Sequence, residues 1–246
     1  MTMFARFFPD LVPEKMGPDA DSLRPFQLDK AAEIWAMDRP SKWAEHKGQF
    51  YARRLAPGIE LDIHWSFEDR PHFNGIEVRL DDRLTRDLTR LDAIVAFVQQ
   101  SCSTLRPVYA WASHNLDFRG KSLIKRYDAD RRTWVESPVP GPPRVLSAIY
   151  WLNYFGPPFV ELFGRQKLIQ APVYAARPVG PGVLILTSPS PLDYGKGGVR
   201  GAEETLKDYL GREAFFDTKR PGGPYRTPTF DFAAVSSSAW TSRLED

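Results

Sequence analysis

The side chains with the most reactive chemistry in this 246-residue sequence are scattered along the chain. The four histidines are His46, His64, His72 and His114. None of them forms a His-x-His pair, a His-Glu-x-x-His motif or an i,i+4 pair, the spacings that let two imidazoles reach one metal ion. The sequence therefore predicts no metal site.

Two residues are candidates for nucleophilic catalysis. Ser113 ends a predicted strand and His114 follows it, but a triad needs a third, acidic group that orients the base, and the sequence indicates none. Cys102 lies in an apolar, predicted helical run, where a lone thiol is typically a small buried core residue. A single cysteine forms neither an internal disulfide nor a thiolate zinc site. We predict no catalytic residue and a protein that is not an enzyme.

Three short motifs resemble sites of phosphate or metal chemistry. Gly195–Gly201 precedes a predicted helix and could hold an anion, but it lacks the Gly-x-Gly-x-x-Gly and Gly-Lys-Ser/Thr spacings. Glu45-His46-Lys47 matches the Glu-x-Lys of restriction-type nucleases, yet it falls on a predicted helix and not on a strand. Asp128-Ala129-Asp130 resembles a metal-binding Asp-x-Asp inside a basic loop. We interpret the first as a flexible turn and the others as chance matches, so no cofactor is expected.

Positive and negative charges nearly balance over the whole chain, but two segments carry an excess of one sign. The 33 bases and 31 acids give a net charge of +2, which neither indicates nor excludes binding to nucleic acid. Residues 60–92 hold nine acids against five arginines, and residues 117–132 hold six bases against three acids. Tyr127 and Trp134 are too few aromatic residues for a stacking platform. We interpret the basic segment as a solvated excursion, with nucleic-acid binding through residues 119–132 as the alternative.

Hydrophobic periodicity predicts the elements that position these residues. Alternating runs over 59–65 and 76–80 predict a pair of antiparallel strands. Leu, Ile and Val at three- and four-residue spacing predict a helix over 84–105, and 108–113 is typical of a strand. The order in this half is β-β-α-β.

The second half is predicted to follow the order β-α-β-β-α. Its expected elements are a strand over 145–151, a helix over 157–163, strands over 173–177 and 183–187, and a helix over 202–210. The two halves together predict an α+β fold whose mainly antiparallel sheet carries the helix 84–105 on one face.

The chain is expected to have three parts. Residues 1–55 are rich in Pro, Trp and mixed charge, with helices predicted over 28–37 and 41–53, and form a helical N-terminal arm. Residues 56–217 form the α+β domain, and residues 218–246 an irregular tail. The N-terminus lacks the apolar stretch of a signal peptide, and no segment approaches the ~20 apolar residues of a membrane helix. We expect a cytoplasmic protein without membrane contact.

One block of sequence is distinctive. It runs over residues 149–164 as Ile-Tyr-Trp-Leu-Asn-Tyr-Phe-Gly-Pro-Pro-Phe-Val-Glu-Leu-Phe-Gly, and a hairpin-like pair and the segment 208–216 follow it. Its aromatic residues can bury large apolar areas, Gly156 permits a sharp turn and Pro157 starts a helix, so we expect the block to serve the fold. The block resembles the immunity protein 52 family of bacterial polymorphic toxin systems, and the resemblance covers roughly residues 57–216.

The resemblance implies a cytoplasmic antitoxin that binds a cognate toxin and occludes it. The toxin would be a nuclease of restriction-endonuclease fold, and the antitoxin itself would contact neither nucleic acid nor membrane. An inhibitor that mimics DNA would be acidic, so the acidic residues 60–92 are the expected toxin-facing surface. The predicted partner-binding residues flank the strand 76–80 and are Glu68, Asp69, Asp81 and Asp82.

Overall fold

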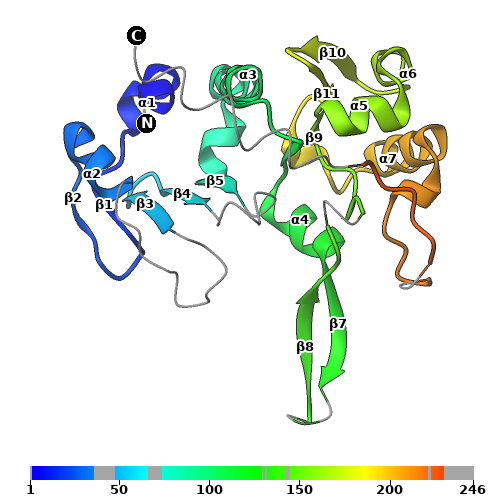
Figure 1. Ribbon diagram of the computed structural model, residues 1–246, viewed down its shortest axis with the longest axis horizontal. Coiled ribbons are helices and arrows are strands. Elements are labelled where there is room, and N and C mark those ends of the chain that lie inside the picture. The colour runs from blue at the N-terminus through cyan, green and yellow to red at the C-terminus, as the bar shows by residue number, and fades with distance from the viewer. Residues whose placement is uncertain are drawn as a thin grey trace. The chain divides into compact units, whose positions relative to one another are not determined.

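The computed structural model describes residues 2–35, 48–65, 74–128, 130, 132–141, 145–220 and 223–229. These residues hold seven α-helices and three antiparallel sheets, which confirms the predicted α+β class (Figure 1). The described residues divide into two compact units, unit 1 of residues 2–97 and unit 2 of residues 98–229. This division falls inside a helix, α3 (Leu88–Leu105), and the three parts expected from the sequence stay a prediction.

Unit 1 is built on a five-stranded antiparallel sheet with the strand order β2-β1-β3-β4-β5. The strands are β1 (Lys15–Gly17), β2 (Arg24–Pro25), β3 (Gly48–Arg54), β4 (Ile59–Trp65) and β5 (Gly75–Leu80). The two alternating runs of the sequence are confirmed as β4 and β5, which pair with Glu60 opposite Arg79. Alternation sends Leu61 of β4 into a core with Phe50 and Ile34, so one sheet face is apolar and the other polar.

The N-terminal segment is not the helical arm that the sequence predicted. A helix was expected over 41–53, but 48–54 form β3, which pairs along its whole length with β4; residues 41–47 lie outside the described part. Three consecutive buried residues, Phe50, Tyr51 and Ala52, hide the alternation of this strand. The helix predicted over 28–37 is confirmed in its described part, as the 3₁₀ turn η2 (Leu28–Lys30) and α2 (Ala31–Trp35).

Aromatic packing joins the start of the chain to α3 within unit 1. The sequence predicted one helix over 84–105, and the structure has the 3₁₀ helix η4 (Asp82–Arg86) followed by α3. The Phe97 ring lies 5.7 Å from the Phe4 ring of α1 (Thr2–Phe7) and 5.6 Å from the Phe8 ring. Asp10 lies in the 3₁₀ helix η1 (Pro9–Leu11) and forms an ion pair with Arg90 of α3.

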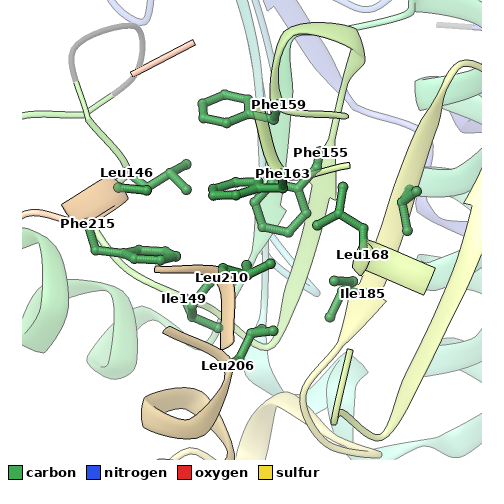
Figure 2. Packing of buried hydrophobic residues seen from close by; sticks show 12 residues of the cluster. Leu146, Ile149, Phe155, Phe159, Phe163, Leu168, Ile185, Leu206, Leu210 and Phe215 are labelled. Atoms are coloured by element: carbon green, nitrogen blue, oxygen red, sulfur yellow. The ribbon is translucent and has the colours of Figure 1, made fainter. Parts of the chain in front are cut away.

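Unit 2 contains a four-stranded antiparallel sheet in the order β10-β11-β9-β6. Its strands are β6 (Tyr109–Ala112), β9 (Leu152–Phe155), β10 (Ala175–Val179) and β11 (Gly182–Leu186), and its helices include α5 (Pro157–Phe163), α6 (Arg165–Ile169) and α7 (Gly197–Leu210). Figure 2 shows Phe155 of β9 packed among Phe159, Phe163 and Ile185 in the core. A Cβ atom at Gly156 would lie 2.1 Å from the carbonyl oxygen of Pro107, so the turn into α5 requires glycine.

The strand predicted over 145–151 is wrong. Within this segment only Leu146 makes a bridge, to Phe215, and β9 begins at Leu152. The side chain of Asn153 makes the two backbone hydrogen bonds that a neighbouring strand would otherwise make with Tyr150. Its Oδ1 accepts a hydrogen bond from the Tyr150 amide at 3.1 Å, and its Nδ2 donates to the Tyr150 carbonyl at 2.8 Å. The buried backbone is thereby satisfied without a sheet ladder.

The basic segment of unit 2, predicted to be a solvated excursion, contains regular secondary structure. It forms α4 (Asn115–Ser122) and a β-hairpin of β7 (Leu123–Asp128) and β8 (Thr133–Pro138), which pair with each other as a separate two-stranded sheet. Figure 1 shows the hairpin extending beyond α4, away from the sheet and helices of its own unit. Residues 218–220 and 223–229 of the predicted irregular tail contain neither helix nor strand.

Candidate protein-binding surfaces

The β7–β8 hairpin presents two large aromatic side chains to solvent. Tyr127 is 51% exposed and Trp134 is 67% exposed. They face each other across the two strands, with ring centroids 5.6 Å apart in an edge-to-face arrangement. A hollow beside them is lined by Lys125, Trp134, Val135 and Glu136. Tyrosine and tryptophan dominate the energetics of protein interfaces, so this pair, which we call the hairpin aromatic pair, can anchor a partner.

A buried ion-pair cluster holds the root of the hairpin. Lys121 of α4 donates hydrogen bonds to Asp117 at 2.9 Å, to Glu203 of α7 at 2.7 Å and to the carbonyl of Ile149 at 2.9 Å. Ser113 donates to the same Asp117 carboxylate at 2.7 Å. Asp117 and Glu203 are only 6% and 5% exposed. The cluster connects α4 to α7 and to the segment before β9, and so fixes where the hairpin begins within unit 2.

Burial sets the protonation behaviour of this cluster. Desolvation raises the pKa of Glu203 above its ordinary value, while the hydrogen bond and charge of Lys121 oppose that rise. One local signal for the cluster, which the sequence analysis did not use, is the i,i+4 spacing of Asp117 and Lys121. Glu203 is 82 residues from Lys121, and no local pattern indicates that contact.

Aromatic stacking and hydroxyl contacts also hold α4 to the body of unit 2. The ring of Phe118 stacks on Trp111 of β6, with centroids 4.7 Å apart. The hydroxyl of Tyr150 hydrogen-bonds Ser122 at the end of α4, and also Ser147 at 3.0 Å. Phe118 and Ser122 are four residues apart and share one face of α4, so these contacts position the helix, and therefore the hairpin that continues from it.

Two of the four acids predicted to meet a partner lie in the described part of the chain, and Glu68 and Asp69 lie outside it. The Asp81 side chain caps η4 by accepting a hydrogen bond from the Arg83 amide at 3.0 Å, and it also pairs with the Arg83 guanidinium. These bonds hold the pKa of Asp81 well below its usual range. Asp82 pairs with Arg86 at 3.3 Å, and its side chain is 48% exposed against 17% for Asp81. Asp82 is therefore the more available of the two for a partner.

The two aspartates are expected to differ in their effect on folding. Asp81→Lys removes an N-cap and should cost ~1 kcal/mol of unfolding free energy, a fall in Tm of about 2–4 °C. Asp82→Lys should leave Tm within about 1 °C, because an exposed ion pair contributes little. Thermal unfolding followed by circular dichroism measures both. Equal melting temperatures for the two variants would contradict the capping role of Asp81.

A second group of acids, which we did not select from the sequence, gathers on the polar face of the unit 1 sheet. Arg79 binds Glu77 at 2.9 Å and Glu60 at 3.1 Å, and Gln49 donates to both oxygens of Asp62 at 2.8 and 2.9 Å. The alternation of β4 and β5 indicated that these acids point away from the core. Their grouping follows from the register of β3, β4 and β5, which the alternation leaves open.

The candidates for catalytic or ligand chemistry take structural roles. Cys102 is buried as predicted, and burial raises the pKa of its thiol to about 12. His114 accepts a hydrogen bond from the Leu116 amide at the start of α4 and stacks on Tyr194. In the glycine-rich segment Gly197 begins α7, and Lys196 pairs with Asp193.

The remaining predictions about sites fall into two groups. Some involve residues outside the described part, and others state that a kind of site or segment is absent. Glu45, His46 and Lys47 lie outside the described part, as does His72. Among the residues that the structure describes, no group of three His, Cys, Asp or Glu side chains could hold a metal ion. No helix there is long and apolar enough to cross a membrane.

Comparison with known proteins returned no matching family model, no matching curated protein and no matching solved structure. The resemblance to the immunity protein 52 family therefore stays a prediction.

Proposed function

We propose that this chain is an immunity protein that binds a cognate bacterial toxin and neutralises it by occlusion, without chemistry of its own. The sequence block at residues 149–164 suggests this class, and the resemblance implies a toxin that is a nuclease of restriction-endonuclease fold. The observation that carries the proposal is the hairpin aromatic pair, since Tyr127 and Trp134 are 51% and 67% exposed on a separate two-stranded sheet.

The hairpin has the properties of a binding element and not of a packing element. Its two strands pair only with each other among the described residues, so each strand has one edge that is not paired with another strand there. Aromatic anchors that fill a partner's pocket supply most of the energy of an interface. The Lys121 cluster fixes the hairpin root, so little conformational freedom is lost on binding at that end.

Acidic residues near β5 are proposed as a second contact, which speeds capture of a basic toxin cleft. Asp82 is exposed, and Glu68 and Asp69 are retained from the sequence prediction alongside Asp81. Complementary charge at the rim of an interface mainly raises the association rate. We therefore attribute most of the binding affinity to the hairpin and part of the association rate to these acids.

The alternative function, nucleic-acid binding through residues 119–132, has fewer available cations than the sequence indicates. Arg119 pairs with Glu136 at 2.6 Å, and Lys121 is occupied by Asp117 and Glu203. A nucleic-acid binder would lose affinity steeply with salt, because each neutralised phosphate releases counterions. Salt-sensitive retention of DNA by the purified chain would favour this alternative over the immunity function.

Co-expression tests the proposed function. The nuclease encoded beside this chain should arrest growth when it is expressed alone, and this chain should restore growth and co-purify with it. A catalytically inactive nuclease provides the matched control, because it should still co-purify although no growth arrest occurs. A neighbouring gene that encodes no toxin, or growth arrest that persists in the presence of this chain, would refute the proposal.

A further inference from the structure

The strand β5 leaves one edge of the unit 1 sheet without a neighbouring strand among the described residues. The strand order ends at β5, and its six residues contain neither proline nor lysine, the residues that often block such an edge. The opposite edge strand, β2, has two residues and includes Pro25. Ile76 of β5 is 50% exposed, and the side chains of Glu77 and Arg79 are 48% and 63% exposed. This edge can accept another strand.

The residues of β5 are complementary to themselves when two copies run antiparallel. With a two-fold axis at Val78, Glu77 of each copy lies opposite Arg79 of the other, and Ile76 lies opposite Leu80. Residues directly opposite each other share a sheet face. The charged pairs therefore continue the polar face that carries Glu60, and the aliphatic pairs continue the apolar face that carries Leu61.

We propose that two copies of this chain associate through β5 into a continuous ten-stranded antiparallel sheet. Arg79 already binds Glu77 and Glu60 of its own chain, and in the dimer it also meets Glu77 of the second copy. The outward backbone groups of β5 become hydrogen-bonded, and exposed Ile76 is partly covered. An interface of one short strand pair lies below the ~1,200 Å² of stable complexes, so the expected Kd is on the order of 10 µM.

Charge reversal in the two positions gives a test with a specific signature. Glu77→Arg places a second arginine opposite Arg79 of the other copy, and Arg79→Glu places a second glutamate opposite Glu77. Each variant alone should remain monomeric. An equimolar mixture should form a heterodimer, because both opposed pairs then carry opposite charges. Sedimentation velocity over about 1–300 µM, a range that brackets the expected Kd, measures the mass of each sample.

The unmodified chain and a control variant complete the experiment. The unmodified chain should pass from monomer to dimer over this concentration range, and Glu33→Lys, which changes an exposed acid of α2, should show the same transition. Circular dichroism establishes whether each variant is folded. If a variant does not fold, the mass of the unmodified chain still tests the proposal. A monomeric mass for the unmodified chain at every concentration would overturn the proposal. So would single variants that dimerise as the unmodified chain does, or a mixture of folded variants that stays monomeric.

Discussion

Replacing both Tyr127 and Trp134 by alanine is expected to weaken toxin binding at least ~100-fold, because a central aromatic anchor is typically worth ~2 kcal/mol or more. Both side chains are more than half exposed, so the substitutions remove little packing from the free protein and Tm should change by less than about 2 °C. Isothermal titration of the toxin domain with the double variant measures the change in Kd. The dissociation rate should carry most of it, because anchors act mainly after encounter.

Tyr174 provides the matched control for this prediction. It is an aromatic residue of unit 2, 60% exposed, that lies outside the hairpin. Tyr174→Ala should leave the toxin affinity within about twofold, since surface side chains outside the interface contribute little. An unchanged affinity for the hairpin double variant would move the interface to another surface.

Replacing Lys121 by methionine is expected to lower the free energy of unfolding by ~3–5 kcal/mol, because it leaves two buried carboxylates without their cation. Methionine keeps most of the volume of the side chain, so the loss reflects charge more than packing. Asp117 and Glu203 are nearly inaccessible to water and cannot recover the lost interaction by hydration. Denaturant unfolding at neutral pH, fitted with a common slope, measures the difference.

Lys207 of α7 is the control for the buried cluster. It pairs with Glu204 at 2.8 Å, but the side chain of Glu204 is 51% exposed. Lys207→Met should therefore cost ~0–1 kcal/mol, the usual range for an exposed ion pair. Losses of equal size for the two lysine variants would show that the Lys121 cluster does not stabilise unit 2 in the way described.

The penalty of Lys121→Met should shrink as the solution is acidified. Burial raises the pKa of Glu203 in the folded protein above its value in the unfolded chain. The folded state therefore takes up a proton before the unfolded state does as pH falls. At pH values above the raised pKa, the ionised Glu203 carboxylate destabilises the folded variant by its full amount. This destabilisation decreases as pH falls from the raised pKa toward the ordinary pKa of a glutamate. A penalty that grows on acidification would contradict this account.

The elements that local pattern determines were predicted from the sequence. The alternation around Leu61, the apolar spacing of the helix α3 and the prolines that start α5 each indicate one structure within a few residues. The elements missed depend on distant partners. The strand β3 buries three residues in a row, and only its pairing with β4 makes a strand of it.

The hairpin was missed because its turn lacks the strongest of the usual signals, although it contains Asp130. Neither glycine nor asparagine occurs between β7 and β8, and Arg132 adopts the left-handed conformation with φ of 51° that such residues normally supply. Charged residues along β7 also resemble a solvated loop. Exposure of Tyr127 and Trp134 follows from the separate two-stranded sheet, and the sequence alone does not distinguish it from burial.

The most direct test of the proposed immunity function is DNA cleavage by the neighbouring nuclease, titrated with this purified chain. We expect a complex with a Kd well below 1 µM, formed with a fixed stoichiometry. Cleavage should fall in proportion to the chain added and stop when the complex is complete. A nuclease that remains fully active in excess of this chain, with no complex at micromolar concentration, would contradict the proposed function.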